Sequence, residues 1–450
     1  MSDAATIAAT PDGVIEGARP TALLPISNLL RISAYWLGLT AIDSSVAKFV
    51  SFRIAYSDIK GDLGIGAATA FTAIGGALVA IAVQPTVGTI SDYTMSRWGR
   101  RKPYIVIGSL LDLVFLAGIA TANTLVAITA FVILLQFSTN TARGPFQGYV
   151  PDLVAEPQVG MASAMVGLMQ VAGNIIGTLL VAAAAITSNL PVALFIVAAI
   201  ELVTMLSVVL RVGKGLPPRD RQGRGWGSIA KEAWGTDILR ERSYVFFVAS
   251  RLFFLVAGGI LFAFDIAYMK NVFGLTQEDA GRLEIVLLAT IAIATGLSIV
   301  PASRLSDRIG RKPVIYGACA VGAAAVTVVA LAPVIPVAVV GAALFGAASG
   351  TFISVDWALL TDIIPRISAG RYMGLSNVAN GSAPLIAAVI GGFTLDVIGH
   401  LTTPAIGART AFLVAVGLYG VAALLLRQVV EPRRARAAET EPEPTTAGAA

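Results

Sequence analysis

The residues of this chain that can do chemistry are a few ionisable side chains set inside long apolar stretches. Asp43 is the clearest case, because it lies near the middle of the apolar segment 29–55 and shares one helical face with Trp36 and Thr40. A charge in hydrocarbon is costly, so such a carboxylate suggests a function. A carboxyl group in apolar surroundings binds a proton more readily. We therefore predict Asp43 as a proton-coupling site.

Asp43 also has alternative roles, and further carboxylates lie in similar positions. Asp43 can equally form a structural ion pair with Lys48 or Arg143, or coordinate sodium with nearby hydroxyl groups. The further proton-coupling candidates are Asp112, Asp265 and Asp356. Asp112, and Glu201 in a later apolar segment, can each serve in proton coupling or in holding the structure together. The residue type does not decide between these two roles.

A polar stripe on the segment 125–149 predicts a cavity or a helix contact. Four of its residues recur at intervals of 4, 3 and 4, which places them on one helical face. Amide groups bind hydroxyls and an indole covers the apolar face of a sugar, so the stripe favours a polyhydroxylated ligand. Each amide alone is more often an interhelical hydrogen bond. The predicted cavity residues are Tyr35, Trp36, Thr40, Gln136, Asn140, Arg143, Gln147, Gln170, Asn174, Trp357, Asn377 and Asn380.

Opposite charges at similar depths predict two gates. Arg53 and Asp265 hold equivalent places near the ends of the segments 29–55 and 244–269, so we expect them to close one side. Arg143 and Asp356 are expected to close the other side. Arg251 is expected to pair with a carboxylate of its own half of the chain.

Other kinds of site are not supported by the residues. The chain has one cysteine, Cys319, and one histidine, His400, which we place in the loop before the last apolar segment. A disulfide framework is therefore excluded, and no metal site is predicted. No phosphate-binding loop or nucleophile elbow is present either, so we expect neither an enzyme nor a cofactor.

Composition indicates that membrane helices position these residues. The 450 residues are 56% hydrophobic and 13% charged, against about a quarter charged in soluble domains. A helix needs roughly 20 apolar residues to cross a bilayer. Twelve such segments predict an all-α integral membrane protein whose two six-helix bundles are related by a pseudo-twofold axis. The segments are 29–55, 66–90, 104–122, 125–149, 161–186, 191–211, 244–269, 280–303, 313–332, 335–361, 371–395 and 408–427.

Basic residues predict the orientation. If both termini share a side, 24 of the 32 Lys and Arg residues lie on that side, four lie opposite and four lie within spans. The positive-inside rule then makes both termini cytoplasmic, in a plasma membrane, and it explains the charge without nucleic acid. No cleaved signal peptide is visible. The predicted parts are an N-tail 1–28, bundles 29–211 and 244–427, a central cytoplasmic loop 212–243, and a disordered C-tail 428–450.

A short basic loop occurs twice, with its prolines 210 residues apart, which indicates two fused copies of one membrane module. The copies are Ser91-Asp92, four residues, Arg97-Trp98-Gly99-Arg100-Arg101-Lys102-Pro103, and Ser306-Asp307-Arg308-Ile309-Gly310-Arg311-Lys312-Pro313. These loops resemble the signature loop of the major facilitator superfamily. The resemblance covers about residues 29–427.

The first copy resembles a narrower branch, the sucrose transporters and their bacterial relatives. The segment from Gly144 to Leu153, Gly-Pro-Phe-Gln-Gly-Tyr-Val-Pro-Asp-Leu, is similar to the same branch. The sucrose carriers have an arginine where this chain has Gln147, and here an arginine stands earlier, at Arg143.

The resemblance implies alternating access by rocking of two bundles, often driven by protons. It also implies that the loops control conformation through pairs that break when the inner side opens. The residues concerned are Asp92, Arg97, Gly99, Arg100, Arg101, Asp307, Arg308, Gly310 and Arg311. The simpler alternative is that these basic residues only enforce topology.

The expected function is proton-coupled symport of a sugar or sugar-like solute by a monomer in the lipid bilayer. Proton-antiport efflux of drug-like or metabolite compounds is one alternative. A membrane sensor that transports nothing is another.

Overall fold

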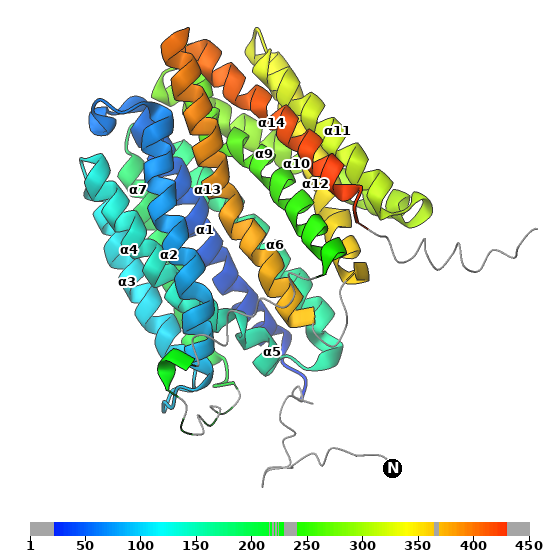
Figure 1. Ribbon diagram of the computed structural model, residues 1–450. Helices are drawn as coiled ribbons and strands as arrows, with labels where there is room; N and C mark the ends of the chain where they lie inside the picture. The colour runs from blue at the N-terminus through cyan, green and yellow to red at the C-terminus, as the bar shows by residue number, and fades with distance from the viewer. Residues whose placement is uncertain are drawn as a thin grey trace, which may run out of the picture.

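The structure, a computed structural model, describes residues 22–429 except 216, 218–219, 221–222, 224, 229–240 and 364–368. This described part is helical, and twelve of its helices are 20 residues or longer (Figure 1). Most of the predicted N-tail, central loop and C-tail lies outside the described residues.

Six long helices form the first half of the chain. They are α1 (Ile26–Tyr56), α2 (Ile65–Asp92), α3 (Lys102–Thr121), α4 (Leu125–Gln147), α6 (Val159–Ile186) and α7 (Leu190–Arg211). A short helix α5 (Tyr149–Leu153) and 3-10 turns at Asp58–Lys60 and Glu156–Gln158 connect them.

Six more long helices form the second half. They are α9 (Arg242–Phe273), α10 (Gln277–Ile309), α11 (Arg311–Ala330), α12 (Ile335–Ile363), α13 (Ala369–Leu401) and α14 (Pro404–Leu426). The last turn of α13 contains His400, so its predicted place in a loop is wrong.

Threonine caps help to set where helices begin. Thr124, Thr276 and Thr403 precede α4, α10 and α14, and each side chain accepts a hydrogen bond from the backbone N–H three residues on, at 3.2 Å. Such caps satisfy a donor that the first turn leaves free.

Eleven helices in the described residues are long and apolar enough to cross a membrane. The remaining long helix, α1, does not meet that measure because it carries Arg31, Asp43, Lys48 and Arg53. The predicted twelve segments thus correspond to twelve long helices, and the one that falls below this measure holds the first proton-coupling candidate.

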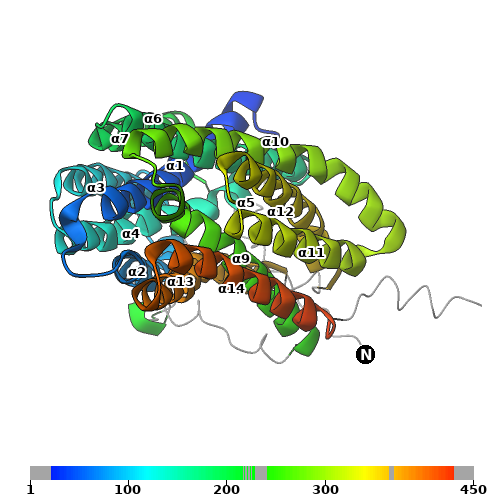
Figure 2. The same cartoon turned by 90° about the horizontal axis from the view of Figure 1, so that it is seen from above.

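The two halves repeat the same packing. In the first half α1 packs on α6 and α7, α2 on α4, and α3 on α4 and α7. In the second half α9 packs on α13 and α14, α10 on α12, and α11 on α12 and α14. Contacts of α2 with α13 and of α6 with α10 join the bundles in a symmetric way, and α1 meets α9 across the interface (Figures 1 and 2). This confirms two bundles related by a pseudo-twofold axis.

A close approach of α2 and α4 depends on glycine. A Cβ atom on Gly144 would lie 2.3 Å from the Gln84 carbonyl oxygen and 3.1 Å from the Gly88 nitrogen. Because those are backbone atoms, they cannot move aside as a flexible side chain would. The helices therefore touch backbone to backbone, which aligns α4 and its polar stripe.

The ends of the molecule differ in how the bundles meet. We call the end that carries residues 93–101 and Gly310 the basic end, and the opposite end the far end. In Figure 1 the loop between α2 and α3 lies at the bottom. Among described residues, the hydrogen bonds and ion pairs that join the bundles lie in the far halves of the helices. The far end is therefore closed by direct contact between bundles.

Candidate functional site

An ion pair between α1 and α4 lies at the centre of the predicted site. The Arg143 guanidinium donates to Asp43 Oδ2 at 2.5 Å and to the Leu39 carbonyl at 3.3 Å. The Asp43 side chain is 35% exposed and that of Arg143 is 16% exposed. The alternative of an Asp43–Arg143 pair is thus confirmed. Arg143 and Asp356, predicted to meet as a gate, each have another partner in this conformation.

The rest of the polar stripe on α4 lies beside this pair. Asn140 donates to the Gln136 carbonyl at 2.7 Å and to its side-chain oxygen at 3.0 Å. The Asn140 side-chain oxygen is buried and has no donor among the described residues. Gln147, at the end of the helix, is exposed. Because Gln136 and Asn140 bond within their own helix, they are not the interhelical bridges that such amides commonly form.

Residues of α6 and α13 complete the predicted polar set. The Thr40 hydroxyl donates to the Gln170 carbonyl at 3.1 Å and so ties α1 to α6. Asn174 on α6 and Asn380 on α13 are exposed. The side chains of Trp357 and Asn377 lie outside the described part of the chain.

Two aromatic residues predicted to line the cavity are buried instead. Tyr35 is 0% exposed and its hydroxyl lies 2.6 Å from Ser109 Oγ on α3. Its ring meets Phe146 edge to face at 4.6 Å between centroids, and Trp36 packs on the same ring at 5.6 Å. Tyr35 therefore forms the core of the first bundle, because the face it shares with Trp36 points to α3 and α4.

The second bundle has its own ion pair. Arg251 on α9 lies 3.2 Å from Asp356 Oδ2 on α12 and donates to Ser376 on α13 at 2.8 Å. Both charged side chains are nearly buried. The expectation that Arg251 pairs within its own half is confirmed. Each bundle thus pairs its first and fourth long helices, with the acid and base exchanged between the halves.

Lys48 on α1 bridges the bundles. Its ammonium group bonds to Asp265 on α9 and lies 2.9 Å from Glu284 Oε1 on α10. The predicted pair of Arg53 with Asp265 is wrong, because Arg53 donates to the Ala122 carbonyl at 3.0 Å within its own bundle. Lys48 stands five residues before Arg53, so it reaches Asp265 from a different face of α1.

Backbone contacts close the far end further. Both carboxylate oxygens of Asp396 on α13 accept from the first amides of α2, Gly66 at 3.0 Å and Ala67 at 2.7 Å. A Cβ atom on Gly66 would lie 2.0 Å from the Gly392 carbonyl oxygen. Amides at a helix N-terminus attract an anion, so this contact is favourable. Asp396 was not singled out from the sequence. Its position as a carboxylate next to the predicted end of a membrane span could have indicated it.

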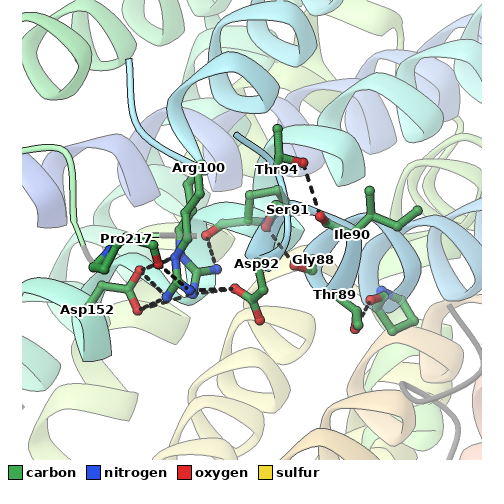
Figure 3. A network of polar contacts seen from close by, with 12 residues as sticks. Gly88, Thr89, Ile90, Ser91, Asp92, Thr94, Arg100, Asp152 and Pro217 are labelled. Atoms are coloured by element: carbon green, nitrogen blue, oxygen red, sulfur yellow. Dashed lines mark hydrogen bonds and ion pairs between the residues drawn. The ribbon is translucent and has the colours of Figure 1, made fainter. Parts of the chain in front are cut away.

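The first basic loop forms a compact charge network at the basic end (Figure 3). Arg100 and Arg101 both bond to Asp152 of α5, at 2.8 Å and 2.7 Å, and Arg101 lies 2.9 Å from Asp92. The predicted pairing of Asp92 with arginines of its loop is present for Arg100 and Arg101. The pairs stay within the first bundle, while Arg97 is exposed.

The second loop repeats parts of this arrangement. Arg311 lies 2.9 Å from Asp307, and Arg308 is exposed. Gly99 and Gly310 have φ angles of +97° and +96°, which a side chain would strain. The positive φ angle at this position therefore explains why both copies of the loop have glycine there.

The lysine of each loop ties two helices together. Lys102 donates to the Val209 and Val212 carbonyls at the end of α7, at 2.8 Å and 2.7 Å. Lys312 donates to the Val429 carbonyl beyond α14 at 2.6 Å. Each lysine thus bonds to carbonyls at or just beyond the end of a helix.

Asp112 and Glu201 lie away from the bundle interface, inside the first bundle, and both are fully buried. Asp112 accepts from Ser138 and Thr139 of α4. In the described residues no group of three or more His, Cys, Asp or Glu side chains is arranged to hold a metal ion.

Known proteins share parts of this sequence. Sucrose transport protein SUT1 of Oryza sativa subsp. japonica is 32% identical over 133 residues, 25% of this chain and 25% of that protein. General alpha-glucoside permease of Schizosaccharomyces pombe is 32% identical over 123 residues, 24% of this chain and 22% of that protein. The matched segments thus span about a quarter of these relatives.

Solved structures share the whole fold. A point mutant of the nucleoside transporter NupG superposes with a TM-score of 0.70 at 15% identity, covering 90% of this chain and 100% of that chain. A D-xylose-proton symporter gives 0.65 at 16% identity, covering 90% and 98%. A profile of the Major Facilitator Superfamily matches residues 37–291 and 246–449. The chain is therefore a multi-pass membrane transporter, not an enzyme, and it belongs to the Major Facilitator Superfamily.

Proposed function

We propose that this transporter moves a sugar or sugar-like solute together with protons, by alternating access, as a monomer in the plasma membrane. The observation that carries the proposal is the Asp43–Arg143 pair beside the amides of α4. Helix α1 is flanked by α4, α6 and α7 and meets α9 across the interface. Asp43 lies at the middle of this helix, and its side chain is partly exposed.

The chemistry of this face suits a polyhydroxylated ligand. A carboxylate accepts and a guanidinium donates several hydrogen bonds, and the free oxygen of Asn140 adds a buried acceptor. Sugar hydroxyls do both, so they can replace the Asp43–Arg143 contact without leaving either group short of hydrogen bonds. The partial likeness to proteins named for sucrose and alpha-glucoside transport supports the same solute class.

The charge distribution supports a cytoplasmic basic end. With 24 of the 32 basic residues on that side, the positive-inside rule places it and both termini in the cytoplasm. On this proposal the far end faces outside, and its contacts between bundles correspond to a state closed to the outside.

Transport in proteoliposomes tests the proposal. We expect sucrose, maltose or another sugar added to an acidic exterior to alkalinise the outer medium, and labelled sugar to accumulate inside. At one proton per sugar, a one-unit pH gradient drives about tenfold accumulation. Asp43→Asn should abolish sugar-dependent alkalinisation, because it removes a charge from the predicted site.

The control is Glu278→Gln, which alters an exposed side chain paired with Arg282 at the far end. It should transport like the wild type. Substrate-induced collapse of an acidic interior would indicate antiport efflux instead, and absence of any flux, including counterflow, would indicate a sensor. Either result contradicts the proposal.

A further inference from the structure

A second pair of carboxyl groups is enclosed within the first bundle. Asp112 projects from α3 and Glu201 from α7, two helices that pack against each other. Both residues are 0% exposed. Neither belongs to the polar stripe or to the contacts between bundles, so the proposed sugar site leaves them without a role.

The hydrogen bonds around the pair are incomplete. Ser138 and Thr139 both donate to Asp112 Oδ1, the latter at 2.8 Å. The other oxygen of Asp112 and both oxygens of Glu201 have no donor at hydrogen-bond geometry among the described residues, although the Ser109 hydroxyl of α3 lies close to Glu201. The two carboxyl groups nevertheless lie within hydrogen-bonding reach of each other.

This geometry implies a proton. An ionised carboxylate only accepts hydrogen bonds, so two ionised groups in contact repel and cannot bond. When one is protonated, its O–H donates to the other carboxylate, and the two facing oxygens are satisfied. We infer that Asp112 and Glu201 together bind one proton, shared between the two carboxyl groups.

The neighbouring helices supply no cation that replaces this proton. From α1, the Tyr35 hydroxyl reaches the site through Ser109. From α4, Arg143 is the charged neighbour, and it is already paired with Asp43. Helix α6, which also packs on α7, contains no ionisable residue.

The repeat shows that packing alone does not require these acids. Asp112 corresponds to Gly322 at the 210-residue offset of the basic loops. In the second bundle a Cβ on Gly322 would lie 2.8 Å from the Tyr419 ring of α14. The equivalent helix pair is thus joined by an aromatic ring on glycine, and the acid pair is particular to the first bundle.

Loss of the shared proton affects the proposed sugar site through Arg143. It leaves two negative charges near Arg143, which then compete with Asp43 for the guanidinium. Release of Asp43 changes the groups offered to the solute. This coupling rests on the proposed proton symport, whereas the shared proton itself does not.

Infrared spectroscopy tests the shared proton without transport. Purified protein in lipid nanodiscs should show a protonated-carboxyl C=O band that shifts in deuterated water. Asp112→Asn and Glu201→Gln should each shift this band, because the remaining carboxyl then bonds to an amide instead of a carboxylate. The double variant should lose the band, and Glu278→Gln should leave it unchanged. Both substitutions are near-isosteric, and thermal unfolding identifies any variant that fails to fold. A band that is unchanged in the single variants, or that survives in the double variant, overturns the inference.

Transport then tests the coupling. Under a one-unit pH gradient, accumulation of sugar by either single variant should fall from about tenfold to about one relative to the outside concentration. Counterflow, which needs no net proton movement, is the reference for each variant. Unchanged gradient-driven accumulation, or accumulation driven by sodium at constant pH, overturns the coupling. A wild type that shows the band but never accumulates sugar refutes symport and leaves the proton site standing.

Discussion

At the scale of single residues, the cation that bridges the two bundles carries the largest expected effect. Lys48 holds Asp265 and Glu284 together although its side chain is only 7% exposed. Removing it leaves two carboxylates close together and poorly solvated. The cost of an ion left unpaired in a protein interior exceeds that of losing a surface pair.

We expect Lys48→Ala to lower the free energy of unfolding by about 3–5 kcal/mol. Thermal or denaturant unfolding in detergent measures this loss. The loss should shrink at low pH, because the remaining carboxyl groups can then be protonated.

A second variant separates charge from packing. Lys48→Ala combined with Glu284→Gln should recover part of the stability, since one of the two unpaired charges is gone. Glu278→Ala, at an exposed pair, should change stability by less than about 1 kcal/mol. A Lys48→Ala protein as stable as the wild type would refute the bridging role.

The ion pairs show where sequence reasoning stops at this scale. Asp43, Arg143, Asp265 and Asp356 were all predicted as functional, and all form ion pairs. Two predicted pairings do not form in this conformation, because position along a helix gives depth but not the neighbouring helix. With several opposite charges at one depth, only the packing of α1 on α4 and of α9 on α12 decides which pairs form.

At the scale of elements, close helix contacts set the position of the polar stripe. Gly144 lets α4 touch the backbone of α2, and it stands next to Arg143 in the sequence. A methyl group there must push the helices apart or tilt α4. Either movement displaces the guanidinium that pairs with Asp43.

We expect Gly144→Ala to destabilise the protein by about 1–3 kcal/mol and to weaken sugar binding. Gly167→Ala is the matched control, because a Cβ on Gly167 of α6 meets nothing within 4 Å. That change should be neutral or stabilise slightly, since alanine favours helix. Equal unfolding midpoints and sugar affinities for the two variants would contradict the close-contact argument.

Elements were more predictable than their contacts. The twelve apolar segments and the repeated basic loops follow from local composition, and the structure places long helices and paired charges there. The link from Lys102 to the end of α7 was not foreseeable, because it joins segments about 110 residues apart through backbone carbonyls that any residue provides.

At the scale of the whole molecule, the far end acts as one closed contact between bundles. Gly66 and Asp396 bring α2 and α13 together, and on the other side of the axis a Cβ on Gly281 of α10 would lie 2.7 Å from the Ala182 carbonyl of α6. These contacts are short, so small additions at either place should separate the bundles.

We expect Gly66→Leu to shift the protein toward a conformation with parted far ends. Spin labels on cysteines introduced at Asp62 and Thr402, both exposed, report this as a longer distance in a Cys319→Ser background. Gly296→Leu is the control, because a Cβ there meets nothing within 4 Å. An unchanged label distance in Gly66→Leu would show that this contact does not hold the far end closed.

The exchanged ion pairs also bear on how a membrane potential acts on this protein. Asp43 with Arg143, and Arg251 with Asp356, each keep equal and opposite charge inside one bundle. When such a bundle rocks, little net charge from these pairs crosses the electric field, whose work on one charge is about 2.3 kcal/mol per 100 mV. The membrane potential then acts on the transport cycle mainly through the ion that is carried. The movement of these two ion pairs with their bundles transfers almost no net charge across the membrane.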